Sequence, residues 1–405
     1  MATFGYQARD TTGQLVIGRL EAEDERAAAA ALSRLGYHPL RITQSGTLQE
    51  LAASLPWRRQ RVDRQDVLLL LRELAALLRA GIPLASSLEG AIQQTPSSAL
   101  RQALQDVTHR VQGGASFSEA LANHPRVFPE LFISMIRVGE AAGILDDVLE
   151  RLAQLGTQEL ETRSRIQSAL IYPVVLVAFA FLVVNGLVIG ILPKFVAVFQ
   201  AGQVELPWPT RLLLGVSGLL RHLWWALVLL GGWAVWQGRR YYATPAGRLA
   251  VDQRLLEIPL AGTLYRKILI ARVTRTVGAM LRTGVPILEA LSVAEKTVPN
   301  VVFQRTLQRT RLAVAEGQSL TDPWTASGLF PPLVLQLVGV GERAGQLDAK
   351  LTEVADFYDP EIDRTVRNLT TLLEPVLLMT MGLVVGFIAL SVLLPIFKVI
   401  HVFRR

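Results

Sequence analysis

Three long apolar segments divide the chain. Residues 169–193 carry no charge and are long enough to cross the roughly 30 Å hydrocarbon core of a bilayer as a helix. Residues 372–397 form a similar segment with one acid, Glu374, near its start. Residues 217–236 are less apolar because they contain Arg221, but their tryptophans suit the membrane–water interfaces. The hydropathy pattern therefore predicts three transmembrane helices.

The polar segments before the first and third apolar segments have the periodicity of short helices. Glycine and proline interrupt this periodicity repeatedly, as they do at helix ends. We predict about six helices in residues 64–168 and about six in residues 266–371. Each segment should form an all-α bundle. The predicted fold class is mainly α, a polytopic membrane protein with two helical domains.

The first 45 residues have a different pattern. Phe4, Tyr6 and Ala8 alternate with polar residues as on a half-buried strand, and residues 15–20 fit the return strand. An Ala-rich helix and a short third strand follow. Residues 1–45 should therefore be a separate ββαβ module, joined by a linker over residues 46–63.

One half of the chain repeats the other. Arg137–Asp146 resembles Val338–Asp348, with an offset of 341 − 139 = 202 positions. A self-match on this scale indicates a duplicated unit, here one helical domain followed by one span. Other paired residues are Gly81 with Gly284 and Pro83 with Pro286 at the breaks between helices. Pro173 pairs with Pro375 where the apolar segments open, and Pro173 would be a helix start or a mild kink there.

The membrane topology follows from charge and from the repeat. The first residues have neither a basic nor an apolar signal region, so we expect a cytoplasmic N-terminus. Basic residues before the first span and after the second should also be cytoplasmic. Because repeated units should cross in the same direction, the second span returns the chain between them. Residues 194–216 then form a periplasmic loop, 237–265 a cytoplasmic connector and 398–405 a short periplasmic tail.

The composition is consistent with a membrane protein, and it excludes several kinds of catalytic and binding site. The chain is 51% hydrophobic with a net charge of +7, and basic charge beside apolar spans favours membrane flanks over nucleic-acid binding. It has no cysteine, its five histidines stand far apart, and no glycine precedes a lysine as in a phosphate-binding loop. We expect no catalytic, cofactor-binding or metal site in this chain, and we expect that the protein is not an enzyme.

The repeated Gly-Glu-x-x-Gly-x-Leu-Asp stretch has two interpretations. In the structural one, Gly143 and Gly345 end a helix and the following Asp146 and Asp348 cap the next one. In the functional one, the turn docks against a partner, with Glu140 and Glu342 as the contacts. A divalent ion beside these acids is a further alternative to simple enrichment of acids at helix starts. The candidate residues in the stretch are Gly139, Glu140, Gly143, Leu145, Gly341, Glu342, Gly345 and Leu347.

Glu374 also has two interpretations. An acid at membrane depth is costly and usually faces protein or water, which would make it functional. Alternatively, it lies just inside the headgroup region. Tyr172, its counterpart in the first repeat, is not acidic, so any role of the charge would be asymmetric.

Together these features resemble the inner-membrane platform proteins of type II secretion and type IV pilus machines (the general secretion pathway F and PilC family). The resemblance covers nearly the whole chain, including residues 18–22 and 35–40 of the N-terminal module. The resemblance rests mainly on the two Gly-Glu-x-x-Gly-x-Leu stretches, on Glu374-Pro375 and on Leu394-Pro395-Ile396-Phe397 near the C-terminus. Residues 206–211 and 357–363 look somewhat like pilus members, whereas 125–129 fits secretion members equally well.

The resemblance implies a multi-pass scaffold of the bacterial inner membrane that forms homo-oligomers and is no enzyme. Its cytoplasmic domains would engage a hexameric secretion or pilus assembly ATPase. Its membrane part would contact lipid and other inner-membrane components of the machine, and would receive pilin or pseudopilin subunits. Nucleic acid would not be a partner. The alternatives are a membrane solute transporter with duplicated domains and a membrane enzyme that uses Glu374 or Glu140.

Overall fold

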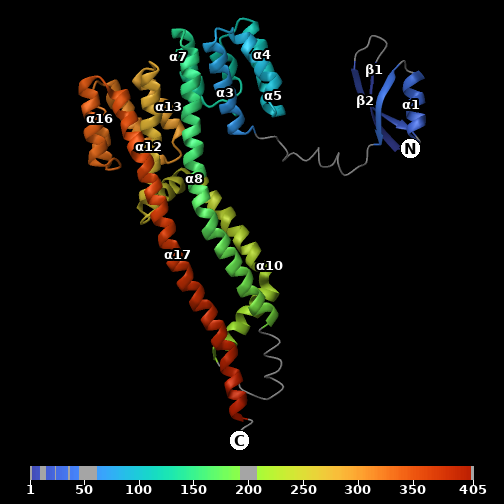
Figure 1. Cartoon of the computed structure of the whole chain (residues 1–405), viewed down its shortest axis with the longest axis vertical. Coiled ribbons are helices and arrows are strands. Elements are labelled where there is room, and N and C mark those ends of the chain that lie inside the picture. The colour runs from blue at the N-terminus through green and yellow to red at the C-terminus, as the bar shows by residue number, and fades with distance from the viewer. Residues whose placement is uncertain are drawn as a thin grey trace. The chain divides into compact units, whose positions relative to one another are not determined.

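The computed structural model describes residues 2–9, 15–22, 24–34, 37–44, 62–191 and 208–402. The chain divides into two compact units: Met1–Val62 with Ser97–Ala99, and Asp63–Pro96 with Leu100–Arg405. Figure 1 shows the elements of both units. Most of the predicted loop over residues 194–216, and residues 403–405 of the predicted tail, lie outside the described residues.

The N-terminal unit is a small sheet with one helix. Its elements follow in the order β1 Ala2–Arg9, β2 Leu15–Ala22, α1 Glu25–Arg34 and β3 His38–Gln44. The strand order is β2-β1-β3 with both pairs antiparallel, so Tyr6 lies between Gly18 and Ile42. Ala28 and Leu32, one turn apart on α1, are fully buried. Asp24 begins this helix by accepting a hydrogen bond from the Ala27 amide (2.6 Å).

Apart from the first two residues of α5, the second unit contains two copies of a six-helix arrangement, as the sequence predicts. The first copy comprises α3 Arg64–Arg79, α4 Leu84–Gln94, α5 Ser98–Gln112, α6 Phe117–Ala122, α7 Glu130–Ala142 and α8 Leu145–Asn185. The second comprises α12 Ala261–Arg282, α13 Ile287–Thr297, α14 Val301–Ala315, α15 Thr321–Ser327, α16 Pro332–Ala344 and α17 Leu347–Val402. Between the copies lie the π-helix η1 Gly186–Ile191, α10 Trp208–Ala243 and α11 Pro245–Glu257.

The breaks between helices have the same backbone geometry in both copies. Pro83 and Pro286 precede α4 and α13 with identical dihedral angles, φ −57° and ψ 144°. Gly81 and Gly284, two residues earlier, have φ of 81° and 86°, a region that glycine enters without steric cost. The predicted capping box of Ser116 and Glu119 is also present at the start of α6.

Each helical domain has its own apolar core. In the first copy the core residues include Leu71, Leu104, Phe117, Met135 and Leu149, all fully buried. In the second copy Trp324 stacks on Phe330, with ring centroids 4.0 Å apart, and Phe303 meets the edge of the same ring at 5.7 Å. Such aromatic contacts add to the area they bury, so each domain is a packed body and not a loose array of helices.

The last helix of each domain continues into an apolar segment without a break (Figure 1). The predicted boundaries at residues 169 and 372 therefore lie inside α8 and α17. Of the two alternatives for Pro173, a helix start or a mild kink, the helix start is wrong because Pro173 lies within α8. A proline removes only one backbone hydrogen bond, whereas a helix end in hydrocarbon would leave several groups unsatisfied. A continuous helix therefore costs less free energy than a helix that ends within the hydrocarbon.

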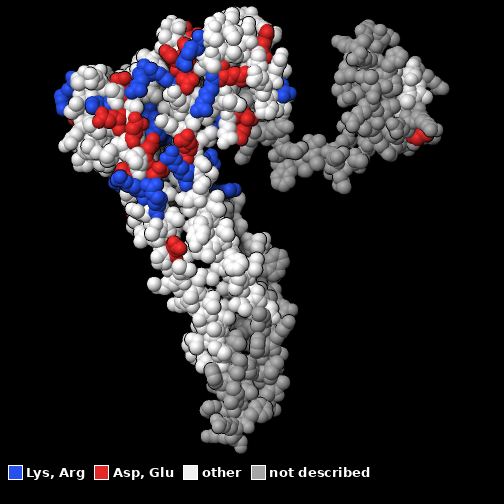
Figure 2. Space-filling model, viewed as in Figure 1, with Lys and Arg blue, Asp and Glu red and all other residues white. Residues whose placement is uncertain are grey.

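Among the described residues, two helices are long and apolar enough to cross a membrane: α8 and the part of α17 from Leu347 to Ser391. Their apolar side chains, such as Phe181 and Leu383, are largely exposed. On the face seen in Figure 2, Lys, Arg, Asp and Glu lie mainly over the helical domains, whereas the described residues of the extension show almost no charged side chains. The second unit is therefore divided into a charged part and an apolar part.

Candidate functional site

The two repeated turns have the same geometry. Gly143 follows α7 with φ 72° and ψ 21°, and Gly345 follows α16 with φ 66° and ψ 21°. The next amide, of Ile144 or Gln346, donates back to the carbonyl of Gly139 (2.9 Å) or Gly341 (2.8 Å). This is the left-handed helix ending that favours glycine, so the prediction for Gly143 and Gly345 is confirmed.

The first glycine of each turn allows two helices to approach closely. A Cβ atom on Gly139 would lie 2.6 Å from Val148 Cγ2, and one on Gly341 would lie 2.8 Å from Lys350 Cβ. Any side chain there would push α7 away from α8, or α16 away from α17. Gly139 and Gly341 thus fix the angle at which each domain joins its long helix.

Glu140 reaches back across its own domain. Its carboxylate accepts hydrogen bonds from the Phe117 amide (2.7 Å), the Ser118 amide (3.1 Å) and the Ser118 hydroxyl (3.0 Å). These amides belong to the first turn of α6, whose donors have no partner within the helix. The glutamate therefore ties the start of α6 to the end of α7.

Glu342 does the same in the second copy. Its carboxylate accepts from the Leu320 amide (2.7 Å) and the Ser319 hydroxyl (2.5 Å), at the start of α15. The sequence interpretation missed this role because the amides precede the glutamate by 22 or 23 residues. The carboxylates of Glu140 and Glu342 are thus engaged within their own domains.

The aspartates of the repeated stretch are not helix caps, so that prediction is wrong. Helix α8 begins at Leu145 and α17 at Leu347, and Asp146 and Asp348 lie in the first turn of each helix. Acids in the first turn still interact favourably with the helix dipole. Each also faces an arginine: Arg79 lies 3.8 Å from Asp146, and Arg282 lies 3.9 Å from Asp348.

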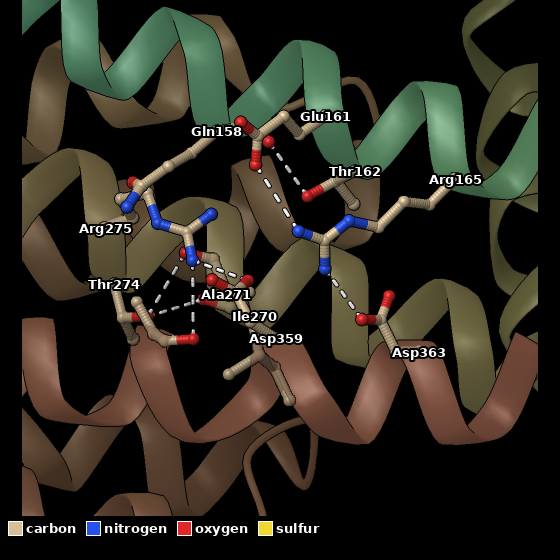
Figure 3. A network of polar contacts seen from close by, with 11 residues as sticks. Gln158, Glu161, Thr162, Arg165, Ile270, Ala271, Thr274, Arg275, Asp359 and Asp363 are labelled. Carbon is tan, nitrogen blue, oxygen red and sulfur yellow. Dashed lines mark hydrogen bonds and ion pairs between the residues drawn. The ribbon is translucent and has the colours of Figure 1, made fainter.

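A polar seam joins the two repeats. We use this name for the ion pairs between α8, α12 and α17 and between α7 and α13. Arg165 on α8 donates to Asp363 on α17 (2.7 Å) and lies 3.4 Å from Glu161 (Figure 3). The other pairs across the seam are Arg272 with Glu159 (2.7 Å) and Lys296 with Glu130 (2.6 Å).

The seam continues into ion pairs within the second copy. Arg275 donates to Asp359 (2.7 Å), so α12 and α17 lie beside α8 in one polar layer (Figure 3). Lys267 donates to Glu361 (2.9 Å) and to the Thr365 hydroxyl (3.0 Å). The hydrogen bond from Lys267 and its positive charge lower the pKa of Glu361.

A buried aspartate links α10, α11 and α14, and no sequence pattern singled it out. Asp252 on α11 is 1% exposed. Its carboxylate accepts from the Tyr242 hydroxyl (3.0 Å) at the end of α10 and from the Val301 amide (2.8 Å) at the start of α14. Its partners lie 10 and 49 positions away, so a lone acid on an amphipathic helix gave no signal.

Glu374 and Pro375 are the remaining candidate residues from the sequence. The side chain of Glu374 is exposed on α17, and Pro375 lies inside that helix. Across the described part of the chain, no three His, Asp or Glu side chains are arranged to hold a metal ion. The polar residues described above therefore form four groups: the two turns, the seam, the contacts of Asp252, and Glu374 at the start of the apolar part of α17.

Comparison with known proteins gives a consistent result. The family model "Type II secretion system (T2SS), protein F" matches residues 70–193 and again residues 273–395. The N-terminal domain model of the same family matches residues 1–43. The two matches of one model coincide with the two structural copies.

Relatives extend over the full chain. The type IV pilus assembly protein PilC of Thermus thermophilus is 37% identical over 401 residues, covering 99% of this chain and 98% of the relative. The type II secretion system protein F of Vibrio cholerae is 33% identical over 409 residues, covering both chains completely. That of Pseudomonas aeruginosa is 34% identical over 399 residues, covering 98% of each.

Proposed function

The chain belongs to the type II secretion system protein F family, and from this premise we propose that it is the inner-membrane platform of a type IV pilus or type II secretion machine. Relatives with both kinds of name cover the whole chain, so the family membership supports either machine. In this role the protein transmits motion and carries out no chemistry of its own.

The continuity of α8 and α17 is the observation that carries the proposal. Helices of 41 and 56 residues are about 60 Å and 85 Å long at 1.5 Å per residue. Each begins at the turn fixed by Gly139 or Gly341 and ends in an apolar segment. A displacement of the helical domain is therefore carried along one rigid helix. We propose that an assembly ATPase moves the helical domains and that this motion reaches pilin or pseudopilin subunits in the membrane.

We propose that α10 is the third span, which returns the chain between the repeats. Supporting this, Leu213 on α10 and Ile388 on α17 are buried together against Val184 and Leu187. The Thr210 hydroxyl also donates to the Ser391 carbonyl (2.6 Å) in the same region. The start of α10 thus packs with the far ends of both apolar helices, where a return span would begin.

The topology can be tested by cysteine labelling, because the natural chain has no cysteine. Gln203→Cys lies in the predicted periplasmic loop and Leu312→Cys in the second helical domain. In intact cells made permeable at the outer membrane, a membrane-impermeant maleimide should label the first variant only. Labelling of both, or of Leu312→Cys alone, would refute the proposed topology.

The function can be tested by deleting the gene and restoring single variants. Deletion should abolish surface pili or type II secretion, and the process that is lost identifies the machine. A complementing copy with Arg165→Asp should restore less activity than one with Lys350→Asp, because Arg165 pairs across the two repeats whereas Lys350 pairs within α17. If both processes continue in the deletion strain, the platform proposal fails.

A further inference from the structure

The turn between α11 and α12 is strained. Leu260 has φ 65° and ψ −58°, and it is the only residue other than glycine with positive φ in the part of the chain that the structure describes. The Ala261 amide donates to the Pro259 carbonyl (2.8 Å), which closes a three-residue γ-turn. A bulky residue rarely adopts this conformation, and such strain often accompanies a function.

The strained turn presents apolar side chains outward. Leu255 at the end of α11 and Ile258 and Leu260 in the turn are 39%, 45% and 53% exposed, and with Pro259 they form what we call the apolar tip; the one charged residue among them, Glu257, is also exposed. Single exposed apolar residues need no explanation, but several of them in and beside one strained turn do.

The apolar tip lies at the level where α17 becomes apolar. Helices α12 and α17 are antiparallel, because Arg282 faces Asp348 whereas Lys267 contacts Thr365. Leu260 precedes Lys267 by 267 − 260 = 7 residues, about 10 Å of helix. The same step along α17 from Thr365 reaches 365 + 7 = 372, and Leu372 is the first residue of the predicted third span.

Several exposed arginines stand within a few helical turns of this level. Exposed arginines stand shortly before or after the apolar parts of three helices: Arg163 on α8, Arg239 and Arg240 on α10, and Arg364 and Arg367 on α17. Figure 2 shows Lys and Arg side chains where the charged domains give way to the uncharged extension. Positive charge at this depth matches the anionic headgroups of a cytoplasmic leaflet.

We propose that the apolar tip inserts into the lipid surface at the headgroup–acyl boundary of the cytoplasmic leaflet, anchoring the start of α12 to the membrane. This inference rests on the proposed membrane placement of α8 and α17. Short apolar segments beside basic residues bind at this depth without crossing the bilayer. Since α12 packs along α17, the anchor restrains one end of the second helical domain while leaving its far end free to move.

The test uses the full chain with single cysteines in nanodiscs that contain anionic lipid. A nitroxide label is placed at Ile258→Cys or Leu255→Cys, with Val376→Cys as the lipid reference and Leu312→Cys as the water reference; both reference side chains are exposed. Collision with oxygen, which partitions into lipid, is compared with collision with a water-soluble nickel chelate. We expect the tip labels to favour oxygen several-fold more than the Leu312→Cys label.

Each other outcome has a distinct meaning. If Val376→Cys reports lipid but the tip labels report water, the tip proposal is overturned and the membrane placement stands. If the tip labels collide with neither reagent, protein covers the tip, which also overturns the proposal. If Val376→Cys itself reports water, the membrane placement fails together with the proposed function.

Discussion

Three residues of the repeated turn have separate physical roles, and each role occurs twice. Gly143 and Gly345 supply positive φ, Gly139 allows close helix contact, and Glu140 holds the start of a helix 22 residues earlier. The first role could be predicted from sequence because a helix ending is local. The other two could not, because they depend on which helix packs opposite.

The left-handed glycines give a prediction about backbone conformation alone. Gly143→Val or Gly345→Val should lower the free energy of unfolding by about 1–2 kcal/mol, because an L-residue is disfavoured at positive φ. A Cβ atom would meet nothing within 4 Å at either site, so crowding is not the cause. Gly143→Asn should be milder, since asparagine tolerates this region. Thermal unfolding of the full chain measures both, and normal stability of the valine variants would contradict this account.

Gly139 gives a prediction about packing instead. Gly139→Ala should destabilise the first domain, because the new methyl group would overlap Val148. Val148→Ala in the same chain should recover part of that loss by removing the overlapping methyl groups. A double-mutant cycle on thermal unfolding checks this coupling. Purely additive effects would mean that the two residues do not meet.

Glu140 allows the capping role to be separated from contact with a partner. Glu140→Ala leaves the Phe117 and Ser118 amides without their acceptor and should cost about 1–3 kcal/mol of stability. Asp147→Ala, which removes an exposed acid 3.6 Å from Arg79, should cost much less. If Glu140→Ala instead keeps full stability but loses binding to the proposed assembly ATPase, the residue serves contact and not capping.

At the scale of elements, the sequence predicted the helices better than their ends. Each domain has the six helices expected, because glycine and proline mark the short connections. The change in hydropathy places the boundaries of the spans at residues 169 and 372, and Pro173 just after the first boundary is compatible with a helix start or a mild kink. The backbone continues through both points, because a helix needs no new signal to continue.

Asp252 determines how α10 is attached to the second domain. Tyr242→Phe removes one hydrogen bond and should lower the free energy of unfolding by about 0.5–1.5 kcal/mol. Asp252→Ala should lower it more, because it also leaves the Val301 amide without its acceptor. The measurement is thermal unfolding, together with hydrogen exchange at the start of α14. Equal protection of these amides in Asp252→Ala and the wild-type chain would contradict the attachment.

The pair of Lys267 and Glu361 predicts a pH dependence. The pKa of Glu361 is lowered below its ordinary value of 4.5 in the folded chain, chiefly by the hydrogen bond from Lys267. A lowered folded pKa gives stability that is complete above about pH 4.5 and is lost as the pH falls through the folded value. The difference in melting temperature between wild type and Glu361→Gln should therefore shrink on acidification below pH 4.5. A constant difference would exclude this linkage.

At the scale of the whole molecule, the duplication was predictable but the contact between the copies was not. The repeat in the sequence predicts two helical domains, each followed by one apolar span. The seam instead joins residues 113, 166 and 198 positions apart, through different faces of the two copies. Helix α7 of the first copy meets α13 of the second, so the contact does not follow from the repeat itself.

The role of the seam can be tested by exchanging the charges of Arg165 and Asp363. Arg165→Asp or Asp363→Arg alone places like charges opposite each other, while the double exchange restores an opposite pair. Because the side chains are 54% and 24% exposed, the coupling should be modest, about 0.2–1 kcal/mol. Filament assembly should nevertheless fall in each single variant and recover in the double, because the pair sets how the two domains meet. Exchanging Lys350 and Glu353, which pair within α17, should leave assembly unchanged. If the double exchange of Arg165 and Asp363 fails to recover assembly while folding normally, the seam does not set the arrangement that the machine uses.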